Sequence, residues 1–184
     1  MQVNSMDKTL IALALEAGAA KAEYFPAGKI VLADHFREIC RSNSCGRYDR
    51  CYMCPPDLGD IHDLMAQVRS YPHAVIYQTI ADLEDPFDYE GMTEAGDFHA
   101  QCSGKLHAAA KDLLTGPWLH ISTGCRLCAR CGKLDGIPCR HPDQAIGSVS
   151  GYGIDVYQTV KDSGLNYVNG QNTVTYFGIL FYKE

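Results

Sequence analysis

The sequence lacks any apolar stretch long enough to cross a membrane, and it lacks any long run of basic residues. The apolar LIALAL stretch at residues 10–15 ends at Glu16, and the residues before it carry no net positive charge. A secretory signal peptide needs a basic start and a longer apolar centre, so an amphipathic helix is the better explanation of this N-terminus. The sequence therefore predicts a cytoplasmic protein that does not associate with a membrane.

Two further absences limit the class of ligand. The net charge is −6 and no basic cluster is present, which argues against nucleic-acid binding. The phosphate-loop pattern GxxxxGK(S/T) is also missing. The segment GYGIDV at 151–156 has only the first Gly-x-Gly of a dinucleotide fingerprint, so we expect it to open a helix.

What the sequence does have is cysteine, with nine in 184 residues. A chain of this length is expected to form a single domain over residues 1–184, with an ordinary apolar core. In the reducing cytoplasm nine cysteines are not expected to form a disulfide framework. They are expected to be metal ligands or redox groups. Eight of them fall in two loop-like segments, at about 40–56 and 124–142.

The spacing of apolar residues predicts helices that alternate with extended segments. The expected helices are 6–17, 33–40, 58–70, 93–115 and 152–163, and the expected extended segments are 20–27, 29–32, 73–81, 118–122 and 173–182, with a turn at 85–92. Such alternation is typical of an α/β fold. We expect a single-domain sandwich, in which a four- to five-stranded sheet is flanked by helices and carries two cysteine-rich metal loops. The last strand is apolar on both faces, so it should lie inside the sheet.

The second cysteine group has the spacing Cys125-x2-Cys128-x2-Cys131-x7-Cys139. Zinc sites usually take ligands as two separated pairs. Three thiols at two-residue intervals are typical instead of a loop around an iron–sulfur cube, as in the bacterial ferredoxin run. The fourth spacing differs from that run, and the residue after Cys139 is Arg140. The pattern favours a 4Fe–4S cluster, with zinc as the weaker alternative.

The first cysteine group is Cys40-x4-Cys45-x5-Cys51-x2-Cys54, followed by two prolines. Its spacing is less specific, because Cys51-x2-Cys54 also suits half a zinc site or a redox dithiol. Four cysteines within fifteen residues of a loop rich in glycine and proline still indicate a metal site.

Basic residues flank both cysteine groups. They are Arg41, Arg47 and Arg50 in the first, and Arg126, Arg130, Lys133 and Arg140 in the second. A cluster held by four thiolates is negatively charged, so nearby guanidinium groups would stabilise its reduced form. The alternatives are docking of an acidic redox partner and ordinary solvated loop charges.

The remaining cysteine and several histidines are weaker candidates. Cys102 stands alone on a predicted helix, where a free cysteine acts as a small hydrophobe. His35 and His141 lie near the cysteine groups as spare ligands, proton relays or solvated loop residues. His99 and His107 are eight residues apart, which is wider than a metal pair on a helix needs, so core or surface positions are expected.

The two motifs resemble those of the DUF2284 family of predicted metal-binding proteins. The resemblance rests on FREICRSNSCGRYDRCYMCPPDLGD and on GCRLCARCGKLDGIPCRHP followed by GYGIDVYQTVKDSGL, and it covers most of the chain from about residue 6. It implies binding of iron–sulfur clusters or another metal in a small cytoplasmic protein of anaerobic microbes, and no established reaction. The family cysteines correspond to Cys40, Cys45, Cys54, Cys125, Cys128, Cys131 and Cys139.

Two positions depart from the family pattern. Cys51 stands where the family usually has no cysteine, and the acidic residue usual near Ser150 is absent. The family pattern gives the first site only three obvious thiols. Either Cys51 supplies a fourth, or Cys139 crosses over from the second group, or one iron stays open.

Three functions are consistent with these residues. The first is electron transfer or redox handling by two 4Fe–4S clusters, with the cysteine loops packed together and a redox protein as partner. The second is an enzyme in which an open iron acts as a Lewis acid on a small molecule, with Tyr48, His141 or Asp57 moving protons. The third is a zinc-stabilised interaction module. The sequence leaves open whether the protein is an enzyme, and it does not indicate an oligomeric state.

Overall fold

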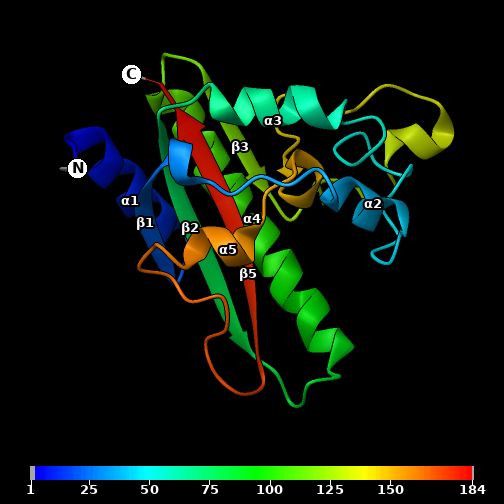
Figure 1. Cartoon of the computed structure of the whole chain (residues 1–184). Coiled ribbons are helices and arrows are strands. Elements are labelled where there is room, and N and C mark those ends of the chain that lie inside the picture. Colours follow the sequence, from blue (N-terminus) through cyan, green and yellow to red (C-terminus); the bar gives the residue numbers. More distant parts are fainter. Residues whose placement is uncertain (1–2, 184) are drawn as a thin grey trace.

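The chain folds around one five-stranded sheet, as a computed structural model that describes residues 3–183 shows (Figure 1). The strands are β1 (Lys21–Pro26), β2 (His73–Asp82), β3 (Trp118–Ser122), β4 (Gly147–Ser148) and β5 (Thr173–Tyr182), in the order β1-β2-β5-β3-β4. The pairs β1–β2, β2–β5 and β3–β5 are antiparallel, and β3–β4 is parallel. The sheet is therefore mixed, and β5 lies at its centre.

The two long strands, β2 and β5, each supply both faces of the core. On one face Val75, Tyr77 and Leu180 pack in the same cluster as residues of helices α1 (Ser5–Ala17) and α4 (Tyr89–Leu113). On the other face Ile76 and Ile179 join residues of α3 (Ile61–Arg69) and α5 (Val156–Val160). Alternate residues of a strand point to opposite faces, so a strand covered on both sides must be apolar throughout. The prediction that the last strand lies inside the sheet is confirmed.

Helix ends follow the local chemistry of the sequence. Asn4 caps α1, because its side chain accepts the Asp7 backbone N–H at 2.8 Å while the Asp7 carboxylate accepts the Asn4 N–H at 2.7 Å. Asp7 is buried and also accepts a hydrogen bond from the Tyr182 hydroxyl, which ties α1 to the sheet. Gly18 ends the helix, as expected.

The α/β sandwich with a five-stranded sheet is confirmed, but several expected elements differ. Residues 29–32 are not a strand: a 3-10 turn, η1 (Ala27–Lys29), is followed only by an isolated bridge between Leu32 and Ile154. The expected helix 152–163 is reduced to η3 (Ser150–Tyr152) and the single turn α5. The long helix α4 begins at Tyr89, inside the expected turn, because Asp88 caps it. The parallel strand β4 was not foreseen.

The remaining elements lie near the cysteines. They are the short helix α2 (Phe36–Arg41) and the 3-10 turn η2 (Gly132–Asp135). In Figure 1 both occupy the same end of the molecule, beyond the sheet. Within residues 3–183 no helix is both long enough and apolar enough to span a bilayer.

Candidate metal centre

The two cysteine loops lie against each other beyond the ends of β3 and β4 (Figure 1). The first loop runs over residues 42–60 between α2 and α3, and the second runs over residues 123–146 between β3 and β4. Arg47 donates a hydrogen bond to the Cys125 carbonyl at 2.7 Å, and the Tyr52 hydroxyl donates to the Ile137 carbonyl at 2.9 Å. Both bonds cross between the loops, so segments about eighty residues apart in sequence form one unit.

Lys133 adds a charged clasp to this unit. Its Nζ lies 2.8 Å from Oδ1 of Asp49 and also pairs with the Asp57 carboxylate. The Lys133 side chain is only 16% exposed, so this pair of contacts is shielded more than an ordinary surface ion pair. Lys133 of the second loop therefore pairs with two carboxylates of the first loop.

Six of the eight predicted metal ligands line one cavity of about 420 Å³ between the loops. They are Cys45 and Cys51 from the first loop, and Cys125, Cys128, Cys131 and Cys139 from the second. None of the nine cysteines is in a disulfide, so the thiols are free to bind metal. Within residues 3–183 no three cysteine, histidine or acidic side chains gather as closely as one metal ion needs.

Cys51 occupies the junction between the two groups. Thiols of Cys125 and Cys54 hydrogen-bond to its sulfur, and these bonds, with the nearby Arg47 charge, lower the pKa of Cys51. The same contacts, followed by burial, raise the pKa of Cys54 and of Cys125. The trio thus accepts one negative charge readily and resists a second. Further thiolates here need a cation to compensate them.

Cys40 and Cys54 do not line the cavity, but each lies near a cysteine that does. Burial, and then the neighbouring Cys45 sulfur, raises the pKa of Cys40. Cys45 also acts electrostatically on Cys54. Gly124 of the second loop lies next to Cys54, and its φ of 97° is a backbone conformation that favours glycine. Each first-group sulfur therefore interacts with another of its group. Cys51 and Cys54 are the two that lie against the second loop.

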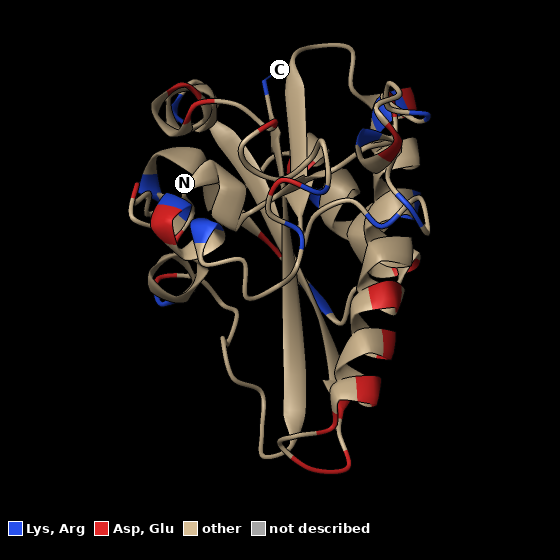
Figure 2. Cartoon of the chain, turned by 90° about the vertical axis from the view of Figure 1, so that its right-hand side faces the viewer, with Lys and Arg blue, Asp and Glu red and all other residues tan. Residues whose placement is uncertain are grey.

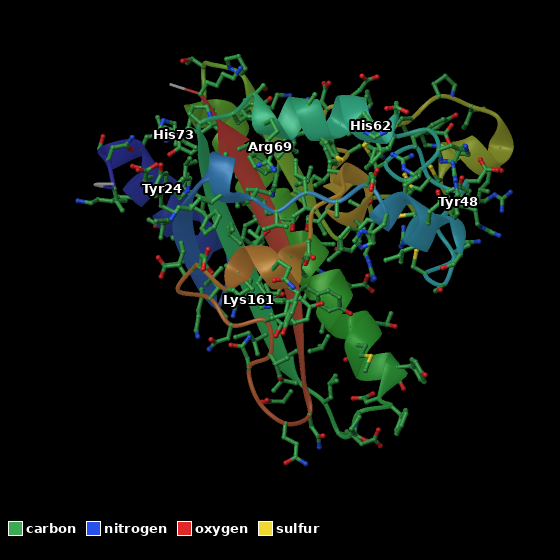
Figure 3. All side chains as sticks on the ribbon, in the orientation of Figure 1. Tyr24, Tyr48, His62, Arg69, His73 and Lys161 are labelled. Atoms are coloured by element: carbon green, nitrogen blue, oxygen red, sulfur yellow. The ribbon has the colours of Figure 1, made fainter. Side chains whose placement is uncertain are left out.

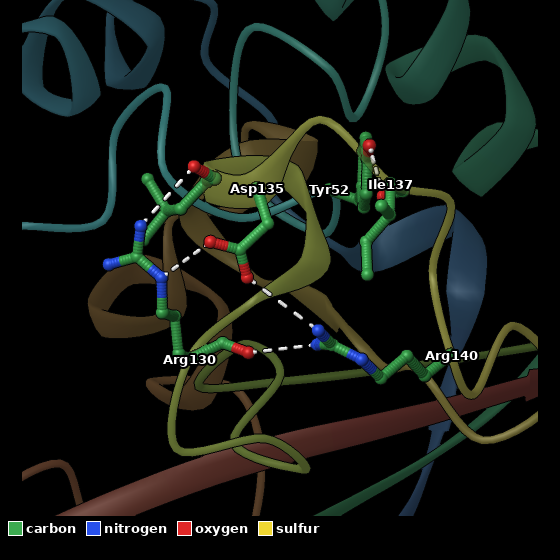
Figure 4. A network of polar contacts seen from close by, with 6 residues as sticks. Tyr52, Arg130, Asp135, Ile137 and Arg140 are labelled. Atoms are coloured by element: carbon green, nitrogen blue, oxygen red, sulfur yellow. Dashed lines mark hydrogen bonds and ion pairs between the residues drawn. The ribbon is translucent and has the colours of Figure 1, made fainter.

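The second loop holds its own shape with a small ionic network (Figure 4). The Asp135 carboxylate lies 2.7 Å from Nε of Arg130 and 3.6 Å from a guanidinium nitrogen of Arg140, and both guanidinium groups lower its pKa. Arg140 also donates to the Arg130 carbonyl at 3.1 Å. These contacts join the stretch after Cys128 to the stretch after Cys139, and so bring the last cysteine back to the first three.

The basic residues predicted near the thiols gather at this end, while α4 and the turn before it are acidic (Figure 2). Arg47, Arg50, Arg130 and Arg140 line the thiol cavity. Arg126 faces α4 instead and pairs with Asp97 at 2.5 Å. Arg41 pairs with Glu38 on the exposed surface of α2. The rim of the cavity is therefore positive in a protein whose net charge is −6.

The proton-moving candidates fall in different places. His141 lines the thiol cavity, whereas the Asp57 carboxylate is paired with Lys133. Tyr48 lies at the cysteine-loop end, opposite the edge of the sheet where Tyr24 and His73 lie (Figure 3). Its backbone N–H donates to the Asn43 side chain at 3.0 Å.

The weaker candidates are now placed as well. His35 stacks on Phe36 at the start of α2 and does not line the cavity. Cys102 is buried in the core, as predicted, and burial raises its pKa to about 11. His99 is also fully buried, and His107 is half-buried on the same helix.

Sequence reasoning missed the residues that join the loops to each other and the residue that holds the second loop in shape. Tyr52, Asp49 and Asp135 have no motif of their own, and their partners lie five to eighty-five residues away in sequence. Gly124 gave a weak signal, as a glycine directly before a cysteine run. Nothing in the linear pattern says that its backbone adopts φ of 97°.

Comparison with known families agrees with this geometry. The family model of DUF2284, described as a predicted metal-binding protein, matches residues 23–182. The chain belongs to this family. No curated protein and no solved structure matches the chain. The DUF2284 assignment and the free thiols at the joined loops together support metal binding.

The donor set at the joined loops suits a soft metal or an iron–sulfur cluster. Thiolate sulfur binds zinc, Cu(I) and iron–sulfur clusters, and carboxylate-preferring ions such as Mg²⁺ prefer oxygen. A cavity of about 420 Å³ is more than ten times the share of liquid volume of one water molecule, about 30 Å³. The residues present therefore fit a group larger than a single ion.

Proposed function

We propose that the joined loops of this DUF2284 protein bind two 4Fe–4S clusters and that the protein transfers electrons. The observation that carries the proposal is the cavity lined by six free cysteines from both loops. Cysteine thiolates are the usual ligands of such clusters, four to each. The eight cysteines of the two groups, seven in the loops and Cys40 near the end of α2, match that number for two clusters.

The contacts among the sulfurs suggest how the ligands divide. Cys139 lines the same cavity as Cys125, Cys128 and Cys131, and its charge acts on Cys125. This supports a second set that is complete within its own loop. The first set is then Cys40, Cys45, Cys51 and Cys54, with Cys51 as the fourth ligand that the family pattern lacks.

Zinc is the less favoured occupant for two reasons. Three thiols at two-residue intervals offer ligands to separate corners of a cube more readily than to one tetrahedral ion. The thiols also surround a wide cavity rather than one point. A zinc-stabilised interaction module is the corresponding alternative function.

A cluster held here would supply one-electron reduction and oxidation. The chain's own contribution is electrostatic: Arg47, Arg50, Arg130 and Arg140 line the cavity, and their charges favour an added electron. The same positive rim suits an acidic redox protein as partner, since complementary charge speeds docking. In this proposal the protein works in the cytoplasm.

Anaerobic purification followed by metal analysis tests the proposal. We expect a brown protein with about eight irons and eight sulfides per chain, and an electron paramagnetic resonance spectrum broadened by coupling between two reduced clusters. A colourless protein with one or two zinc ions per chain would overturn it. About four irons and a simple spectrum would reduce the proposal to one cluster.

A second candidate function is an enzyme in which an open iron binds a small molecule. It is favoured by a second cavity that shares residues 125 and 127–129 with the thiol cavity. The iron content of a Cys51→Ala variant distinguishes the two functions. If Cys51→Ala keeps all of its iron, then Cys51 is not an essential ligand and an open iron becomes the better proposal.

A further inference from the structure

A second cavity, of about 550 Å³, lies between α4, the end of β3 and the second cysteine loop. Its volume is within the range of small-molecule sites, roughly 300–1,000 Å³. Arg47 and residues 125 and 127–129 line both cavities, so a molecule in the second cavity would lie next to the thiols. The apolar part of the wall is Ala100, Leu127, Ala129 and Ile146.

The charged part of the wall is built around Arg126. Its guanidinium pairs with Asp97 at 2.5 Å and lies over the backbone of α4 at Gly96. A Cβ added at Gly96 would come within 2.9 Å of that guanidinium, so glycine is needed for the arginine to lie there. Arg47 is the second cation on the wall and Asp97 the single anion. Apart from the thiols of Cys125 and Cys128, the wall therefore keeps one net positive charge.

The floor of the cavity is a buried network of hydroxyl and imidazole groups. Ser103 and Ser122 line the cavity and are nearly inaccessible, with Oγ atoms 2.9 Å apart. Ser122 Oγ also lies 2.9 Å from Nε2 of His99. The Tyr77 hydroxyl donates to Ser103 Oγ at 2.6 Å and lies 2.8 Å from Nε2 of His120.

This network is uncharged at neutral pH. Burial lowers the pKa of His99 to about 4, lowers the pKa of His120 well below its usual value, and raises the pKa of Tyr77. The floor therefore adds no charge to the wall. Thr79, whose hydroxyl lies 2.8 Å from Nδ1 of His99, brings the joined polar side chains beneath the cavity to six, and a network satisfied in this way fixes the shape of the floor.

Gly104 is a further sign that the cavity is kept open. It lies in the interior of α4, where glycine costs about 0.5–1 kcal/mol relative to alanine. A Cβ added there would meet nothing within 4 Å, so packing does not require glycine. The same residue lines the cavity, where a larger side chain would occupy its space.

We propose that this second cavity binds a small monocarboxylate with an apolar body. Its carboxylate would lie against the guanidinium of Arg126. Its apolar part would lie against Ala100, Leu127 and Ile146. A guanidinium matches the two oxygens of a carboxylate, and one net positive charge suits a single negative charge better than the two of phosphate.

Calorimetric titration of the anaerobically purified protein tests this site, with benzoate as the probe. Benzamide has the same shape without the charge, and inorganic phosphate has the charge without the apolar body. We expect saturable benzoate binding that is at least about tenfold tighter than that of either control. Equal binding of benzoate and benzamide, tighter phosphate binding, or no saturable benzoate binding would overturn the proposal.

Variants of the wall residues test whether benzoate binds in this cavity. Arg126→Gln should weaken benzoate binding about tenfold to a hundredfold and leave benzamide binding unchanged. Gly104→Leu should abolish binding by filling the cavity, while Gly104→Ala should change the affinity less than about threefold. Lys105→Gln removes a charge from the same helix outside the cavity wall and should change nothing. Benzoate binding to a folded Gly104→Leu protein at parental affinity would overturn the assignment.

This site does not depend on the electron-transfer proposal, because none of its proposed contacts involves a metal. Iron is therefore measured on each titrated sample. Benzoate binding by protein with zinc in place of iron would remove the electron-transfer proposal and keep this one. Eight irons without benzoate binding would do the reverse. If Gly104→Leu does not fold, Arg126→Gln with unchanged iron content still decides the outcome.

Discussion

The two cysteine loops meet at one cavity but are built differently. The second loop carries four partly buried cysteines, all on the cavity, and holds its shape with the Arg130–Asp135–Arg140 network. The cysteines of the first loop range from the exposed Cys45 to the buried Cys51 and Cys54. The first loop also depends on the second for Arg47, Tyr52 and Lys133 contacts. The second loop thus presents all four of its cysteines to the cavity, whereas the first loop presents only Cys45 and Cys51.

This difference predicts that losing a cysteine of the second group disturbs both groups, whereas losing one of the first group disturbs only its own. The largest expected effect follows from it. Cys125→Ala removes a ligand of the second set and a hydrogen-bond partner of Cys51, so we expect most of about eight irons to be lost. Cys40→Ala lies at the far end of the first set and should leave about four. Iron and sulfide analysis of anaerobically purified variants measures both.

Equal iron loss in these two variants would show that the loops are equivalent. Cys102→Ala is the matched control, because it removes a buried thiol from the core, outside both cysteine groups. It should lower stability but keep all of the iron.

Cys51 provides the next test of the asymmetry. If it is the fourth ligand of the first set, Cys51→Ala should lose about four irons and keep the signal of the second cluster. Electron paramagnetic resonance of the reduced variant should then show one cluster without coupling. Loss of all iron would mean instead that Cys51 serves both sets.

Acid should weaken the buried contact that holds the start of the second loop, which is the contact between His99 and Ser122. His99 contacts Ser122, the last residue of β3 before this loop, and burial lowers its pKa from 6.5 to about 4, with a small contribution from Arg126. Between these pH values the unfolded chain binds a proton that the native chain does not. Stability is therefore full above about pH 6.5 and falls toward pH 4, by on the order of 3 kcal/mol.

Urea unfolding at pH 7 and pH 5, followed by circular dichroism, measures this effect. His99→Asn should be less stable at pH 7, because it breaks buried hydrogen bonds, but its stability should change less between the two pH values. His62→Asn is the control, because His62 lies on the exposed side of α3. If His99→Asn keeps the full pH dependence, the source is elsewhere.

The smallest expected effect concerns the clasp between the loops. Lys133→Met removes the contacts with Asp49 and Asp57 and should cost about 1 kcal/mol of unfolding free energy. Arg41→Met breaks an exposed pair with Glu38 inside α2, where a smaller loss is expected because solvent screens the pair. Urea midpoints compare the two. Equal values would mean that the clasp is no stronger than a surface ion pair.

The elements that sequence predicts well are those whose signal is local. Asn4 and Gly18 bound α1 through contacts within one turn, and β5 is placed inside the sheet by its own apolar residues. The segment 147–154 was predicted badly, because its glycines pack against residues that are far away in the sequence. A Cβ at Gly151 would come within 2.6 Å of the Leu58 side chain, and Gly153 adopts φ of 70° beside the Ala33 carbonyl. The helix there cannot begin until Asp155 caps it.

The cysteine pattern by itself indicated metal binding, because thiol spacing within a loop is a local property that the sequence states directly. It left open whether Cys51 or Cys139 completes the first site. Only the tertiary structure brings Cys51 against Cys54 and Cys125, and places Cys139 on a cavity that Cys45 and Cys51 also line. The second cavity was invisible for the same reason: Arg47, Gly104 and Ser122 come from three separate segments, and packing alone brings them onto one wall.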